Sequence, residues 1–181
     1  MGKLDGWLVL DGYEDEPAAF GVPNYVGFHI RYICGVLEDR GIEYTYMTVD
    51  QWRGLFKSEL STLEGRKNVR EQMGELDGAI LLAGAVVPGK YIRGTPISRG
   101  ETDAFLSSIP SRIPVICGGW AIRHWRQSGW VSPRSNLFCS LKDIDATLNH
   151  FLSTGKMSHK KRSPDEWSRW ALKGASSKAV V

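Results

Sequence analysis

The first residues that could do chemistry are carboxylates that follow a short apolar stretch near the N-terminus. The segment WLVLDGYEDEPAAFGVPNY carries four of them, at Asp11, Glu14, Asp15 and Glu16. Carboxylates at this spacing can hold a hard cation or exchange protons with a substrate. Acidic clusters in loops are more often solvated or paired with a cation, and Lys90 and Arg93 could supply one. The residues by themselves leave both interpretations open.

Two further segments have the composition of binding loops. AGAVVPGKYIRGTPISRGE, from Ala83 to Glu101, and the acidic segment are both long and rich in Pro, Gly and apolar residues. Loops of more than about 12 residues are usually functional or disordered, and this composition favours ordered loops that pack on a ligand. CGGWAIRHW follows a third apolar run. Its Gly118-Gly119 pair either lets a bulky ligand approach the backbone or makes a tight turn.

Several kinds of site are disfavoured by the motifs. No GxGxxG follows the first apolar run and no GxxxxGK[ST] occurs, so neither a dinucleotide site nor a P-loop is indicated. No spacing supports a Ser-His-Asp or Cys-His pair, and the four histidines are interpreted as surface or packing residues. The three cysteines are far apart and embedded in apolar runs, which predicts reduced, buried thiols and no zinc or iron–sulfur site in this chain.

The bulk composition predicts one globular domain that resides in the cytoplasm. The chain has 181 residues with 42% hydrophobic residues and a formal net charge of only +3, so a nucleic-acid partner is not indicated. No apolar run approaches the roughly 18 residues of a membrane span, and the N-terminus does not resemble a signal peptide. The basic run near Lys160 is interpreted as a solvated linker.

The apolar periodicity predicts alternating strands and helices that would position these loops. Strands are expected at 6–12, 42–49, 76–84, 113–119 and 136–140. Helices are expected at 25–41, in pieces over 50–75, and at 101–109, 120–129 and 141–155, the last with a side-chain cap. This alternation is typical of a three-layer α/β/α, flavodoxin-like domain with a parallel sheet of about five strands in the order 2-1-3-4-5.

The expected topology gives the three loops a common place. Ligands of such sheets bind beyond the carboxyl ends of the strands, near the switch point between strands one and three. The predicted domain covers residues 1–155. Residues 156–181 are predicted to form a basic linker and a helix over 163–174. The sequence therefore predicts a ligand site built from three loops at one edge of the sheet.

The loop motifs also resemble those of a known family. DGYEDEPAAFGVP, a helix with RYICG, VPGKYIRGTPIS and PVICGGW together resemble the N-terminal cobalamin-binding-like domain of archaeal radical SAM proteins, over nearly the whole chain. The ending WALKGASSKAVV resembles the approach to the radical SAM barrel. The resemblance implies that this barrel, with its 4Fe-4S cluster and S-adenosylmethionine, is missing from the chain and is its partner.

The resemblance implies a cobalamin site at the carboxyl edge. The DxHxxG motif that supplies the cobalt-ligating histidine in many cobalamin domains is absent, because Gly12 and Tyr13 follow Asp11. The SxL element after strand three is absent as well, whereas the Gly-Gly after strand four is present. Cobalt would then be held without a protein ligand. No catalytic residue and no metal ligand is assigned. The cofactor-binding residues expected are Asp11, Tyr13, Pro17, Gly21, Gly84, Lys90, Tyr91, Arg93, Gly118, Gly119 and Trp120.

Three functions remain in competition at this stage. The first is a module that binds cobalamin or the substrate, in which bulky replacements of Gly118 and Gly119 are expected to abolish binding and leave the fold intact. The second is a degenerate domain that only docks on the barrel, favoured by the missing histidine. The third is a stand-alone flavodoxin-like oxidoreductase or a hydrolase that uses the acidic loop.

Overall fold

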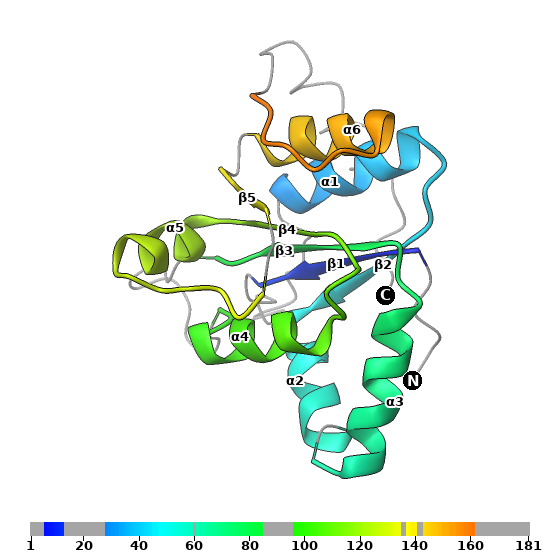
Figure 1. The fold of residues 1–181 in the computed structure, drawn as a ribbon, viewed down its shortest axis with the longest axis vertical. Helices are drawn as coiled ribbons and strands as arrows, with labels where there is room; N and C mark the ends of the chain where they lie inside the picture. Colours follow the sequence, from blue (N-terminus) through cyan, green and yellow to red (C-terminus); the bar gives the residue numbers. More distant parts are fainter. Residues whose placement is uncertain are drawn as a thin grey trace, which may run out of the picture.

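The structure, a computed structural model, describes residues 6–12, 28–59, 61–84, 96–134, 137–140 and 143–161. Its centre is a five-stranded, all-parallel sheet in the order β2-β1-β3-β4-β5 (Figure 1). This confirms the predicted flavodoxin-like topology. The strands are β1 (Trp7–Asp11), β2 (Tyr44–Thr48), β3 (Gly78–Leu82), β4 (Val115–Gly118) and β5 (Leu137–Cys139).

Helices cover both faces of this sheet, as a three-layer fold requires. One face packs against α1 (Phe28–Asp39) and α6 (Ile144–Thr154), and the other against α2 (Val49–Ser58), α3 (Leu63–Gly74), α4 (Arg99–Ser108) and α5 (Trp120–Gln127) (Figure 1). Every residue of β1, β3 and β4 is buried. The uninterrupted apolar runs of the sequence reflect this burial from both sides.

Two helices on the second face begin with a capping box. Thr48 and Gln51 cap α2, and Ser98 and Glu101 cap α4, each pair exchanging side-chain and backbone hydrogen bonds. The strand predicted for 42–49 therefore ends at Thr48, and the helix predicted for 101–109 begins two residues earlier. In each pair the hydroxyl accepts from the backbone N–H of Gln or Glu, and the Gln or Glu side chain accepts from the backbone N–H of the hydroxyl residue, which fixes where each helix begins.

The start predicted for α6 is wrong in one respect. Its N-cap residue, Asp143, makes no side-chain cap hydrogen bond. The Asp143 carboxylate instead accepts a 2.6 Å hydrogen bond from the Ser140 hydroxyl. The predicted end is confirmed, because Gly155 adopts a left-handed φ of 68° there.

The side chains expected in the core are buried where the structure describes them. The thiols of Cys34, Cys117 and Cys139 are buried and reduced, as predicted. Burial raises the pKa of the Cys34 thiol to about 12, so it stays protonated at neutral pH. Within the described part of the chain, no helix is long and apolar enough to cross a bilayer.

The described part of the predicted linker, residues 156–161, has no regular secondary structure and lies along α6 (Figure 1). The Lys160 backbone N–H donates to the Thr147 hydroxyl at 3.0 Å, and that hydroxyl lies 3.3 Å from the Lys160 carbonyl oxygen. These bonds hold the segment against the domain. The helix predicted for 163–174 lies outside the described residues.

Candidate functional site

The loops after β1 and β3 meet at the carboxyl edge of the sheet, at least at their described ends. The Gly12 N–H donates to the Leu82 carbonyl at 2.7 Å, and the Ile97 N–H donates to the Gly12 carbonyl at 2.9 Å. A Cβ atom on Gly12 would lie 2.4 Å from the Leu82 carbonyl oxygen. These hydrogen bonds hold Ile97, near the end of the loop after β3, against Gly12 at the end of β1. The described ends of the two loops therefore converge, as predicted.

Two clefts open at this edge, on either side of Trp120. The α4 cleft has a volume of about 940 Å³, and the β5 cleft has a volume of about 770 Å³. Trp120 lines both, and 59% of its surface is exposed. The α4 cleft is further lined by Arg53, Gly84, Pro96, Ile97, Ser98, Arg99, Glu101, Ala121, His124 and Trp125. The β5 cleft is further lined by His29, Gly119, Ile122, Arg123, Arg126, Gln127, Phe138, Cys139 and Ser140.

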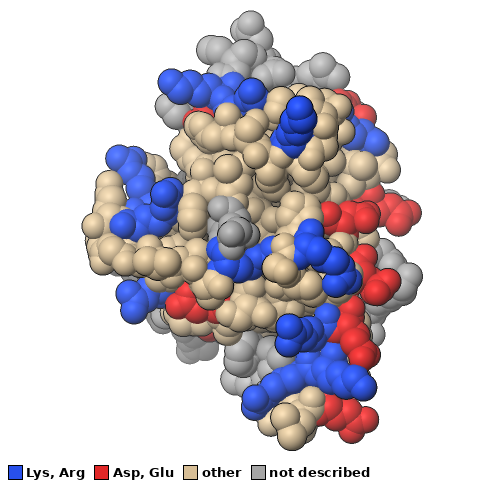
Figure 2. Space-filling view, viewed as in Figure 1, with Lys and Arg blue, Asp and Glu red and all other residues tan. Residues whose placement is uncertain are grey.

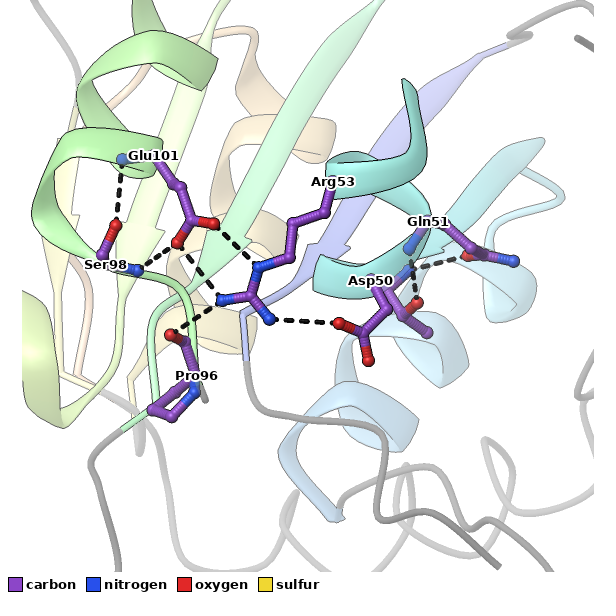
Figure 3. A network of polar contacts seen from close by, with 7 residues as sticks. Asp50, Gln51, Arg53, Pro96, Ser98 and Glu101 are labelled. Atoms are coloured by element: carbon purple, nitrogen blue, oxygen red, sulfur yellow. Dashed lines mark hydrogen bonds and ion pairs between the residues drawn. The ribbon is translucent and has the colours of Figure 1, made fainter. Parts of the chain in front are cut away.

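An ion-pair network forms one wall of the α4 cleft (Figure 3). Arg53 of α2 donates to both carboxylate oxygens of Glu101, at 2.7 and 3.3 Å, and to the Pro96 carbonyl at 3.2 Å. It also pairs with Asp50 at 3.0 Å. Bidentate Arg–carboxylate pairs fix both partners in orientation. The network therefore ties α2 to α4 and to the end of the loop that follows β3.

The same network shifts the titration of Glu101. The hydrogen bonds from Arg53, with smaller help from Ser98, lower the pKa of this carboxyl to about 2, from an ordinary value of 4.5. A carboxyl whose pKa is lower in the folded than in the unfolded chain stabilises the fold above the unfolded value. This contribution is lost as the pH falls from about 4.5 toward 2.

We expect Glu101→Gln to remove this pH dependence. Glutamine keeps the capping box but loses the charge, so the variant should lose about 1 kcal/mol of unfolding free energy at pH 7. Urea titrations between pH 7 and pH 2.5 should show that wild type loses this advantage on acidification. Asp50→Asn is the control, because that carboxylate is 53% exposed against 28% for Glu101. Identical pH profiles for wild type and Glu101→Gln would contradict the assignment.

The sequence left two interpretations of the Gly118-Gly119 pair open, and the geometry favours the tight turn. Gly119 has a φ of 112°, and a Cβ there would lie 2.1 Å from the Ala83 carbonyl oxygen. A Cβ on Gly118 would lie 3.0 Å from the Ile144 side chain. Protein atoms occupy the space that the missing Cβ atoms leave. The expectation that bulky replacements would leave the fold intact is therefore wrong, since they would clash with the scaffold.

Five of the predicted site residues are described, and three of them line a cleft. Gly84 lines the α4 cleft, Gly119 the β5 cleft and Trp120 both. Asp11 is buried at the end of β1 and accepts a 3.0 Å hydrogen bond from the Tyr46 hydroxyl, and it lines neither cleft. Gly118 lines neither. The other predicted residues lie outside the described part of the chain: Tyr13, Pro17, Gly21, Lys90, Tyr91 and Arg93.

Sequence reasoning missed most of the polar residues of the clefts. Ser98 and Glu101 form an S-x-x-E motif, which is typical of a helix N-terminus. This motif could have placed both residues in the first turn of α4. No local signal marks Arg53 as a cleft residue, because Pro96 and Glu101, its partners in the cleft wall, are 43 and 48 residues away in the chain. Among the described residues, no group of three or more His, Cys, Asp or Glu side chains could hold a metal ion.

Comparison with known proteins gives relatives but no function. No protein-family profile matches the chain. An uncharacterized protein of Archaeoglobus fulgidus is 39% identical over 93 residues, which is 51% of this chain and 16% of the relative. An uncharacterized protein of Methanocaldococcus jannaschii is 29% identical over 180 residues, or 93% of this chain and 31% of the relative. The chain thus spans less than a third of the length of either relative.

Proposed function

We propose that this chain is a ligand-binding module of a larger protein, and that it binds cobalamin, or the substrate, at the carboxyl edge of its sheet. The observation that carries the proposal is the pair of clefts that meet at Trp120 on that edge. The strand order supports it, because doubly wound sheets bind ligands there. Part of the support is the resemblance of the loop motifs to cobalamin-binding-like domains.

The described residues are compatible with a large, flat organic ligand. The walls are largely apolar or aromatic, with Trp120 and Trp125 on one side and Phe138 on the other. Pockets of organic ligands have this composition, with a few polar groups that fix orientation. The exposed indole of Trp120 would supply a face for the ligand, and the Arg53 network would keep that side of the mouth open. Cobalamin would supply an alkyl-transfer or redox centre when bound.

The remainder of the larger protein is also part of the proposal. We infer a radical SAM barrel as the partner domain, with the 4Fe-4S cluster and S-adenosylmethionine bound there and not by this chain. The partial coverage of both relatives is consistent with a further domain. We also infer a cytoplasmic location, supported by three buried, reduced thiols.

A spectral titration tests the proposal directly. We expect hydroxocobalamin and methylcobalamin to show saturable absorbance changes with the purified chain, with a base-off spectrum because no histidine follows Asp11 in the DxHxxG position. Trp120→Ala should weaken binding about tenfold, which is ~1.4 kcal/mol, because the ligand loses an aromatic contact. The control is Leu63→Ala, since Leu63 is equally apolar and 85% exposed on α3, away from both clefts. Absence of any spectral change at high excess would refute cobalamin binding by this chain.

A docking module is the second candidate, and a specific observation favours it. Trp120 and Val131 are large apolar residues that are 59% and 84% exposed at the two ends of the α5 region. A partner that covers the α5 region would bury both side chains. If cobalamin fails to bind while the rest of the larger protein, added in trans, quenches tryptophan fluorescence in wild type but not in Trp120→Ala, docking replaces cobalamin binding.

A further inference from the structure

The β5 cleft has a one-sided charge. Its ionisable side chains include Arg123, Arg126 and His29, and none of the described residues that line it is Asp or Glu. Figure 2 shows blue Lys and Arg atoms gathered over the end of the molecule where Figure 1 labels α5. Cationic groups without carboxylates concentrate anions in a cleft, because low-dielectric walls focus their field.

The two arginines differ from those that have structural roles. Arg53 is bound to two carboxylates and a carbonyl, and Arg134 donates to the carbonyls of Ile109, Ser111 and Ile113. Arg123 and Arg126 make no ion pair or side-chain hydrogen bond with any residue in the described part of the chain. No described residue therefore occupies the N–H groups of these two arginines.

An aromatic ring also orients one of them. The guanidinium carbon of Arg126 lies 4.2 Å from the centroid of the Phe138 ring. A guanidinium stacked on a ring keeps its N–H groups free at the edge, where they match the oxygens of a phosphate. Phe138 and Trp120 also give the same cleft two aromatic side chains on which a flat group can pack.

We propose that the β5 cleft is a phosphate-binding subsite, in which Arg123 and Arg126 hold a phosphate ester attached to a flat heteroaromatic ring. This inference does not depend on cobalamin binding. The chemistry is shared by two sources, a free nucleotide and the nucleotide arm of a larger cofactor. In both, the arginines grip the phosphate and the aromatic side chains contact the ring.

The experiment uses the whole chain and calorimetric titration with adenosine monophosphate, adenosine and inorganic phosphate. If the ligand is a free nucleotide, adenosine monophosphate should bind measurably and adenosine at least tenfold more weakly. Arg126→Gln should weaken the nucleotide about tenfold, and the double variant with Arg123→Gln about a hundredfold, because each charge-assisted contact is lost. Added salt should weaken binding in wild type more than in the double variant.

A second arm separates the two sources. If the phosphate belongs to a cofactor arm, the double variant should weaken hydroxocobalamin but not cobinamide, which lacks the nucleotide. Arg70→Gln, an exposed arginine on α3, is the matched control, and equal urea midpoints establish that all variants fold. The proposal is overturned if the double variant binds each of these ligands as wild type does, or if no ligand binds. Equal binding of both hydroxocobalamin and adenosine monophosphate by wild type and double variant would refute the phosphate subsite and leave cobalamin binding intact.

Discussion

Gly119→Ala should lower the free energy of unfolding by about 3 kcal/mol or more, from strain in the backbone and a clash with it. Gly119 has a φ of 112° and a ψ of 164°, a region that residues with a Cβ rarely adopt. The added methyl would also lie 2.1 Å from the Ala83 carbonyl oxygen. That carbonyl accepts a hydrogen bond from the Ala121 N–H, so it cannot retreat without breaking the contact that joins β3 to α5.

Urea denaturation of the purified variant measures this loss. Gly54→Ala is the control, because Gly54 lies within α2 and a Cβ there meets nothing within 4 Å. That change should leave stability equal or raise it by about 0.5–1 kcal/mol, since alanine favours the helix. If Gly119→Ala unfolds at the wild-type midpoint, the turn must be able to relax, and the structural reason for the Gly-Gly pair would be wrong.

The second large effect is expected at Trp52. This side chain is 0% exposed and meets the Phe105 ring edge-on at 5.3 Å between centroids, which joins α2 to α4 in the core. Trp52→Ala should cost about 3–5 kcal/mol, because it removes buried apolar surface and leaves a cavity. The Arg53–Glu101 pair links the same two helices, so the α4 cleft should also lose its shape.

Trp120→Ala is the matched control for this prediction. The same residue type is removed, but Trp120 is 59% exposed, so stability should change by no more than about 0.5 kcal/mol. Thermal and urea unfolding of both variants should separate a tryptophan that holds the scaffold from one that is available to a ligand. Equal losses in the two variants would mean that Trp120 also stabilises the fold, and its place in the proposed site would need revision.

The described walls of the two clefts differ in charge. The α4 cleft has an internally neutralised wall, in which Arg53 is matched by Glu101 and Asp50. The β5 cleft is lined by Arg123 and Arg126, and no Asp or Glu is among its described lining residues. A ligand that spans both would place an uncharged, bulky part against Trp120 and Trp125, and an anionic part against Arg123 and Arg126 of the same helix. This arrangement gives the cobalamin and phosphate proposals separate tests on one protein.

Sequence alone determined the fold class, because the pattern that encodes it is local and repeated. Five apolar runs alternating with amphipathic segments predict a parallel sheet covered on both faces, and the observed order is the one common in five-stranded sheets of this kind. The helix ends near Gly41, Gly129 and Gly155 could also be predicted, because the positive φ that often follows a helix favours glycine. The edge of the sheet that carries the clefts followed from the topology.

Only the tertiary structure decided which side chains meet at that edge and what each one does there. Arg53 and Glu101 are 48 residues apart, and nothing local in either segment marks the other as its partner. The role of Gly119 depends on the Ala83 carbonyl, which the fold brings to its Cα from another strand. Periodicity records whether a side chain is buried, whereas pairing and crowding depend on distances between segments. For that reason the sequence could predict the edge of the sheet where a site is expected. Which described side chains line the two clefts at that edge depends on the packing of the folded chain.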